Sequence, residues 1–216
     1  MPIDNKLCSL NCAYCQYGWT QIHTNDGRTN LEQFPTPDEV LLAVKRALAI
    51  HTKIDYITFS GNGEPTLHPD FSQIVQVIKS FRDQMQPDVN LAILSNSTTC
   101  SRPEIQQAFE HLDLPIMKLD AGNEKTFKRL NHGKPPVSLE SVMAGLKSLK
   151  KFVIQSMFVR GKIDNSSDWE VNSWIQRLQE LLPLWVQIYS LDRDTASDGL
   201  LKVEPGRLQE IADMAE

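Results

Sequence analysis

Three cysteines near the start of the chain can act together as metal ligands. Cys8, Cys12 and Cys15 form a C-x3-C-x2-C run, and thiolates on so short a loop can converge on one metal centre at low entropic cost. A structural zinc or a closed iron-sulfur cluster normally takes four protein ligands, whereas three leave one coordination position open for a substrate or cosubstrate. The run therefore predicts an open iron site or, with His23 or Cys100 as the fourth ligand, a structural zinc site.

A glycine-rich turn supplies a second set of polar groups. The segment Ser60-Gly61-Asn62-Gly63-Glu64-Pro65-Thr66 directly follows a predicted strand. Glycines let the backbone approach a ligand closely, and the carbonyls of such a turn, with Glu64, can accept hydrogen bonds from an ammonium group. Asn62 is compatible with this turn because asparagine tolerates a positive φ. Alone, a segment of this kind is more often only a turn; its place after a strand makes it a candidate site.

A regular framework must position these residues, and the chain predicts one. From residue 36 onward, helical and extended patterns alternate, which is typical of repeated βα units around a mostly parallel sheet or barrel. The first seven residues leave room for one more strand, but Pro2-Ile3-Asp4 is a poor candidate. The predicted strands are 55–60, 90–95, 115–120, 152–159 and 184–189, and the first of them should be buried. The predicted helices are 37–51, 70–83, 103–111, 123–130, 138–150, 168–182 and 205–214.

Composition limits the class of protein. The chain has 216 residues, 22 Lys and Arg against 27 Asp and Glu, a net charge of −5 and 41% apolar residues, which predicts one packed globular domain. No run of about 18 apolar residues could span a bilayer, and the N-terminus lacks the apolar stretch of a signal peptide. We therefore expect a cytoplasmic protein with free thiols and with no membrane or DNA partner.

The motifs resemble those of a known family. The cysteine run, with the aromatic Tyr14 before its third cysteine, is similar to the signature of the radical S-adenosylmethionine (radical SAM) superfamily, and the glycine turn stands where that superfamily carries a Gly-Gly-Glu-Pro type segment. Four later segments resemble the bacterial and archaeal branch related to the tRNA wyosine synthesis enzymes, namely 94–98, 117–122, 155–161 and 186–193. The fold that this implies is α/β, an incomplete (βα)6 TIM-like barrel with its first strand short or missing, as a single core domain over residues 1–216.

The resemblance also implies an activity. Cys8, Cys12 and Cys15 would hold a 4Fe-4S cluster, and S-adenosyl-L-methionine (SAM) would bind its fourth iron. Reduction by a partner such as flavodoxin or ferredoxin would cleave SAM to a 5′-deoxyadenosyl radical, which takes a hydrogen atom from an unidentified substrate; a tRNA base is the candidate by analogy. The implied SAM contacts are Tyr14 beside the adenine, the turn residues Gly61, Asn62, Gly63, Glu64 and Pro65, and Asn96, Asp120 and Gln155 for the ribose or carboxylate.

Some features depart from the pattern of that family, and some of the site candidates also fit structural roles. Relatives usually carry a longer segment ahead of the cysteine loop, which indicates a truncated or misassigned start, and the absence of extra N-terminal cysteines argues against wyosine chemistry itself. Asn96, Asp120 and Gln155 can equally cap helices or close turns. A metal-binding structural module and a degraded SAM-binding scaffold without turnover remain the alternatives.

Overall fold

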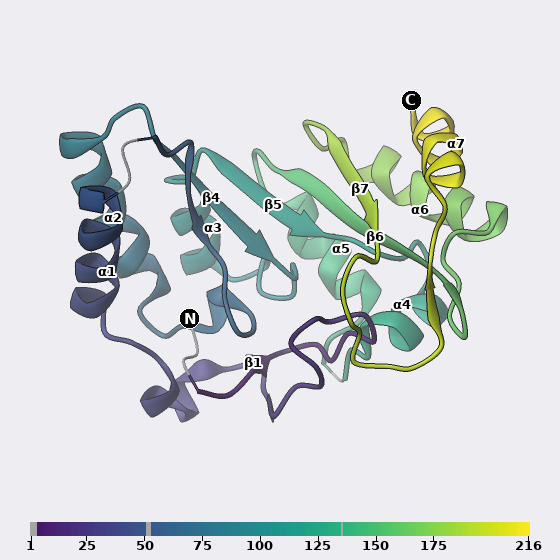
Figure 1. Ribbon diagram of the computed structural model, residues 1–216, viewed down its shortest axis with the longest axis horizontal. Helices are drawn as coiled ribbons and strands as arrows, with labels where there is room; N and C mark the ends of the chain where they lie inside the picture. Colours follow the sequence, from purple (N-terminus) through teal and green to yellow (C-terminus); the bar gives the residue numbers. More distant parts are fainter. Residues whose placement is uncertain (1–3, 51–52, 135) are drawn as a thin grey trace.

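The computed structural model describes residues 4–50, 53–134 and 136–216, and within them the chain has an α/β fold (Figure 1). The predicted end of the first helix at His51, and Pro2 and Ile3 of the weak strand candidate, lie outside the described residues. The strands are β1 (Leu7–Cys8), β2 (Ile22–His23), β3 (Tyr56–Phe59), β4 (Asn90–Ser95), β5 (Leu114–Lys118), β6 (Val153–Gly161), β7 (Val186–Ser190) and β8 (Leu200–Lys202). The helices are α1 (Pro37–Ile50), α2 (Phe71–Met85), α3 (Pro103–Phe109), α4 (Glu124–Asn131), α5 (Leu139–Lys147), α6 (Asp168–Leu181) and α7 (Pro205–Ala215).

The main sheet has the order β3-β4-β5-β6-β7, and all of these neighbours are parallel. Parallel neighbours require crossovers, which the intervening helices provide. The five predicted strands are therefore confirmed, and the predicted helices all exist with ends that differ by a few residues. Strand β8 was not predicted: it is three residues long and pairs antiparallel with the end of β6, too short to show a period-two pattern.

The prediction that strand 55–60 is buried is wrong. In β3 only Phe59 is buried, and Tyr56 is 48% exposed. The physical reason is its place in the sheet: among the described strands, β3 pairs only with β4 and forms one edge. A run of β-branched and aromatic residues indicates a strand but cannot tell an edge from a centre.

Local sequence explains where several helices begin. Thr36 and Glu39 form a capping box before α1, since Glu39 accepts a hydrogen bond from the Thr36 N–H at 2.7 Å and Thr36 Oγ1 accepts one from the Glu39 N–H at 3.3 Å. Asn123 caps α4 by accepting a hydrogen bond from the Thr126 N–H at 3.0 Å. Each cap gives a hydrogen-bond partner to a backbone N–H of the first turn, which has none within the helix.

The core fixes the carboxyl ends of the central strands. Trp174 of α6 is 1% exposed and meets Phe158 of β6 edge to face, with ring centroids 5.1 Å apart. Its indole N–H donates to the carbonyl of Leu119, just beyond β5, at 3.1 Å. The direction in which residues leave β5 is therefore held by a fully buried side chain.

The N-terminal segment runs past the carboxyl ends of the strands, where it is drawn in purple in Figure 1. Strand β1 begins at the end of the first seven residues, where the sequence left room for one more strand, but it pairs with β2 in a separate two-stranded sheet. The Leu7 N–H donates to the Asn62 carbonyl at 3.3 Å, and the Glu64 N–H donates to the Leu7 carbonyl at 3.0 Å. The cysteine loop is thus attached directly to the glycine turn that follows β3.

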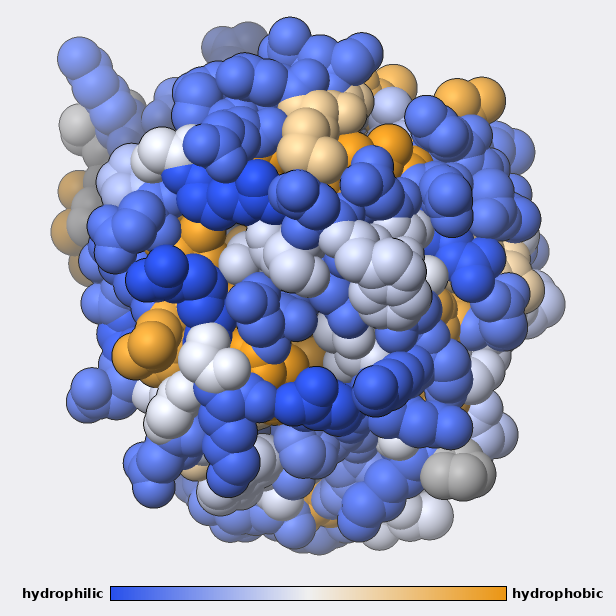
Figure 2. Space-filling view, turned by 90° about the vertical axis from the view of Figure 1, so that its right-hand side faces the viewer, coloured by the Kyte–Doolittle hydropathy of each residue, from blue (hydrophilic) through white to orange (hydrophobic). Residues whose placement is uncertain are grey.

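The surface offers no broad apolar face on the side that carries the C-terminal part. Figure 2 shows that side as largely hydrophilic, with small separated apolar areas. Across the described residues, none of the helices has both the length and the apolar character needed to cross a membrane.

Candidate active site

The cysteine loop is docked on the end of helix α4. The last carbonyls of an α-helix have no hydrogen-bond partner within the helix. Here the cysteine loop provides the donors: the Ala13 N–H donates to the Leu130 carbonyl at 2.8 Å, and the Asn11 N–H donates to the Asn131 carbonyl at 3.0 Å. At the other end of the loop, Lys6 donates from Nζ to the Gly18 carbonyl at 2.6 Å. The loop is therefore fixed at both ends.

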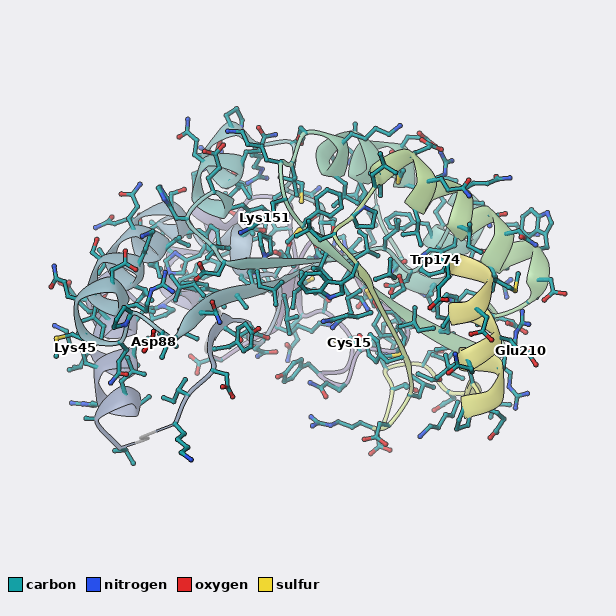
Figure 3. All side chains as sticks on the ribbon, turned by 90° about the horizontal axis from the view of Figure 1, so that it is seen from above. Cys15, Lys45, Asp88, Lys151, Trp174 and Glu210 are labelled. Atoms are coloured by element: carbon teal, nitrogen blue, oxygen red, sulfur yellow. The ribbon has the colours of Figure 1, made fainter. Side chains whose placement is uncertain are left out.

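The three cysteines line one cavity of about 370 Å³, within the size range of small-molecule sites. Seen from above, Cys15 lies near the middle of the molecule, between the helices at its two ends (Figure 3). The carboxyl ends of β3, β4, β5 and β7 and the cysteine loop all contribute to the wall, as expected for a site at this end of parallel strands. Besides the cysteines, the residues that line it include Lys6, Tyr14, Ser60, Gly61, Gly63, Glu64, Ser95, Asn96, Lys118 and Tyr189.

Two carboxamides donate hydrogen bonds to cysteine sulfurs. Asn96 Nδ2 is 3.3 Å from Cys8 Sγ, and Asn131 Nδ2 is 3.4 Å from Cys12 Sγ. Burial raises the pKa of the Cys8 thiol to about 12 and that of Cys12 to about 11. Both thiols are therefore neutral without a metal, and a metal must displace their protons on binding.

A buried ion pair stands behind the loop. Lys118 Nζ is 2.9 Å from Asp120 Oδ1 and donates to Tyr189 Oη at 2.9 Å, with its charge 5.2 Å from the centroid of the Tyr14 ring. Burial acts to lower the pKa of Lys118, but the charges and hydrogen bonds of Asp120 and Tyr189 together outweigh it, so the pKa is raised and the ammonium stays charged. Asp120 also accepts hydrogen bonds from Tyr14 Oη and from Asn131 Nδ2, the latter at 2.9 Å. The network joins the cysteine loop to β5 and β7.

In the glycine turn, the backbone at Gly63 packs closely against β1, and the next residue, Glu64, is buried. Gly63 has a φ of +132°, and a Cβ there would lie 1.8 Å from the Leu7 carbonyl oxygen, so no other residue fits without moving β1. Burial raises the pKa of Glu64, while its hydrogen bonds oppose the rise. The carboxylate accepts bonds from Thr66 Oγ1 at 2.6 Å, Ser95 Oγ at 2.9 Å and the Asn96 N–H at 2.6 Å. Glu64 thereby ties the turn to the end of β4.

One detail of the turn differs from expectation. Asn62 is not among the described residues with a positive φ, so the reason given for asparagine at this position is wrong. Its backbone adopts a conformation open to any residue, and its carbonyl accepts the Leu7 N–H.

The structure brings most of the predicted site residues together. Cys8, Cys12, Tyr14, Cys15, Gly61, Gly63, Glu64 and Asn96 all line the cavity, whereas Asn62, Pro65, Asp120 and Gln155 are not among the lining residues described. Gln155 Nε2 instead donates to Gln187 Oε1 at 3.1 Å, between neighbouring strands. A role of the latter four in binding a ligand stays a prediction.

Sequence reasoning missed four polar residues of this region. Lys118 could have been found, because it lies two residues before Asp120 in the predicted strand 115–120, where a period of two puts both on one face. Lys6, Asn131 and Tyr189 carry no comparable pattern. The position of Asn131 in particular depends on where α4 ends, because the next residue, His132, leaves the helix with a φ of 49°.

The structural-zinc alternative lacks a fourth ligand in the described part of the chain. Cys100 lies in the core, with its Sγ 3.6 Å from Met117 Sδ. His23 lies opposite Cys8 in the β1–β2 ladder, but among the described residues it is not gathered with the cysteines around one metal ion. Among residues 4–50, 53–134 and 136–216, no group of three or more His, Cys, Asp or Glu side chains is arranged around a single metal ion. Three thiols around one cavity suit a larger, multinuclear group better.

Comparison with known proteins identifies related sequences and folds. The sequence family described as the radical SAM superfamily matches residues 5–202. This range contains the cysteine run, the glycine turn and every strand of the parallel sheet.

Two relatives are each 30% identical to this chain. One is a protein of Brachyspira hyodysenteriae named GTPase Obg, matched over 199 residues, which are 91% of this chain and 28% of that protein. The other is a UPF0026 protein of Methanocaldococcus jannaschii, matched over 146 residues, 67% of this chain and 42% of that protein. The chain thus spans less than half the length of either relative. It contains no Gly-x4-Gly-Lys-Ser/Thr segment of the kind that binds GTP phosphates.

A solved structure supports the fold. TYW1 with a lysine-pyruvate adduct bound superposes with a TM-score of 0.62 at 16% identity, covering 97% of this chain and 70% of that chain. Similarity at this level of identity concerns the fold alone. It confirms the predicted α/β architecture of an incomplete barrel.

Proposed function

The chain belongs to the radical SAM superfamily, and from this premise we propose that Cys8, Cys12 and Cys15 hold a 4Fe-4S cluster beside a SAM site. The observation that carries the proposal is that the three thiols and the glycine turn line one cavity. Enzymes of this superfamily use a 4Fe-4S cluster and SAM. The donor set fits: three sulfurs leave one iron without a protein ligand, and two of the sulfurs already accept N–H donors.

When bound and reduced by one electron, the cluster supplies the electron that cleaves SAM to methionine and a 5′-deoxyadenosyl radical, which takes a hydrogen atom from the substrate. The residues of the chain bind, orient and shield. Lys6 lines the cavity, and its positive charge favours the thiolate of Cys8. The charge of Lys118 is paired with Asp120 instead. Leu10, Leu94 and Met157 line the same cavity with apolar atoms, which helps to exclude water.

For the SAM contacts we propose the residues named from the sequence that line the cavity. Tyr14 would lie beside the adenine, and the carbonyls of Gly61 and Gly63 would accept bonds from the amine. The Gly61 carbonyl already accepts the Gly63 N–H at 2.9 Å and would use its second lone pair. Glu64 would act through the turn, because its carboxylate is occupied by Thr66, Ser95 and Asn96.

The substrate is a separate proposal. A tRNA base is the class that we favour, from the resemblance to wyosine synthesis enzymes and from an exposed aromatic residue beside the cavity: Tyr17 lines it and is 53% exposed, so it can stack on a base. Arg193, which also lines the cavity and bonds to Gln16 Oε1 at 2.8 Å, can meet a phosphate. Residues 1–216 would serve as one core domain, with flavodoxin or ferredoxin as the electron donor.

Cleavage of SAM tests the proposal. Protein reconstituted without oxygen with iron and sulfide, then given dithionite and SAM, is expected to form methionine and 5′-deoxyadenosine. Iron bound without SAM affinity would identify a structural module, and SAM bound without cleavage would identify a scaffold. Either result would refute the proposed enzyme. Modified nucleosides of total tRNA, compared between cells with and without the gene, test the substrate: an unchanged set excludes tRNA.

A further inference from the structure

Asn131 is a buried side chain whose position the proposed reaction does not yet explain. It is the last residue of α4 and is 2% exposed. Its Nδ2 is 2.9 Å from Asp120 Oδ2, 3.4 Å from Cys12 Sγ and 3.4 Å from Tyr14 Oη. A carboxamide has two N–H hydrogens. One therefore serves Asp120, and the other lies between the sulfur and the tyrosine oxygen.

The tyrosine oxygen competes weakly for that second hydrogen. Tyr14 Oη already donates its own hydrogen to Asp120 Oδ2, which fixes the rotation of the hydroxyl. A sulfur that carries negative charge is the stronger acceptor, because hydrogen bonds to charged groups are about twice as strong as neutral ones. Once Cys12 is a thiolate, the Asn131 N–H is directed to its sulfur.

Hydrogen bonds to cluster sulfurs and fixed charges near them set the reduction potential of an iron-sulfur cluster. Reduction adds one negative charge, which is shared with the sulfurs, so an N–H donor stabilises the reduced form more than the oxidised form. Building on the proposed function, we propose that Asn131 is a positioning residue that acts through Cys12 to raise the reduction potential of the cluster. Asn96 has the matching contact on Cys8, but it also lines the SAM cavity.

Asn165 provides a matched control for a purely structural effect. It is also 2% exposed, and its Nδ2 donates to the carbonyls of Asp120 and Met157, both at 2.8 Å. Like Asn131 it therefore donates to Asp120, but its Nδ2 donates to no cysteine. Leucine at either position keeps the branching and the number of side-chain heavy atoms and removes the donor.

The experiment is a redox titration of the reconstituted proteins, followed by electron paramagnetic resonance (EPR) of the reduced cluster. At a fixed potential, Asn131→Leu is expected to lower the ratio of reduced to oxidised cluster about tenfold, which is about 59 mV for one electron. Asn131→Gln, which keeps a carboxamide, should recover part of the shift. Asn165→Leu should leave the potential unchanged, although it also destabilises the fold.

Several outcomes would overturn the inference. An Asn131→Leu cluster that titrates at the wild-type potential would do so, as would an equal shift in Asn165→Leu. If Asn131→Leu holds no cluster, pulsed EPR decides by comparing the wild type with Asn131→Gln, both labelled with ¹⁵N at asparagine. Couplings from Asn96 and the other asparagines are common to both proteins, so a nitrogen coupling lost in Asn131→Gln supports the inference, and identical spectra refute it. Wild-type protein without iron would instead refute the proposed function, and this inference with it.

Discussion

Cys15→Ala is expected to leave the anaerobically reconstituted protein with less than one iron per chain, against about four in the wild type. Cys15 lines the cavity with Cys8 and Cys12. With one thiol missing, two irons of the cluster would lack protein ligands, and such a cluster is lost to chelators and water. Iron and sulfide analysis, together with the visible absorption of the oxidised cluster, measures the effect.

Cys100→Ala is the matched control. Cys100 is fully buried and contacts Met117 in the core, and burial raises the pKa of its thiol. Its removal leaves a small cavity and costs about 1 kcal/mol of stability, with the iron content unchanged. Full iron in Cys15→Ala, or loss of iron in Cys100→Ala, would contradict the assignment of the three ligands.

Gly63→Ala should have the second-largest effect, because it detaches the cysteine loop from the sheet. The new Cβ would fall 1.8 Å from the Leu7 carbonyl oxygen, and the φ of +132° is strained for any residue other than glycine. Relief requires β1 to move, which breaks the bond between the Glu64 N–H and Leu7. We expect the free energy of unfolding of the apoprotein to fall by about 3 kcal/mol in urea and the Kd for SAM of the reconstituted protein to rise at least tenfold.

Gly206→Ala controls for the change of residue type. No atom lies within 4 Å of a Cβ at Gly206, which is in the first turn of α7. Alanine should therefore be neutral or stabilise the helix by up to about 1 kcal/mol, with SAM affinity unchanged. A Gly63→Ala protein with wild-type stability and SAM affinity would show that the turn does not position the site.

Much of the fold could be predicted, since each βα unit carries its own local pattern. The capping box at Thr36 and the apolar spacing after it define α1 without reference to the rest of the chain. What could not be predicted depends on neighbours distant in sequence. The exposure of Tyr56 follows from the edge position of β3, and β8 exists only because β6 extends to Gly161 and offers it a partner.

The candidate site likewise contains residues that local sequence predicts and residues that only the tertiary structure brings together. Cys8, Cys12 and Cys15 are recognised because ligand type and spacing lie within one short loop. Asn131 could not be found from sequence: it reaches Cys12 across 119 positions, and only the docking of the loop on the end of α4 brings the two together. Asp120 shows the intermediate case. Its place after β5 is predictable, but its bonds to Lys118, Tyr14 and Asn131 are tertiary.

The central claim is that the cluster bound by three cysteines has an iron open to SAM. EPR of the dithionite-reduced protein, recorded with and without SAM, tests it most directly. A spectrum of a 4Fe-4S cluster that changes on addition of SAM, and does not change with S-adenosylhomocysteine at the same concentration, is the expected result. A cluster spectrum indifferent to SAM, or iron held by four protein ligands, would contradict it.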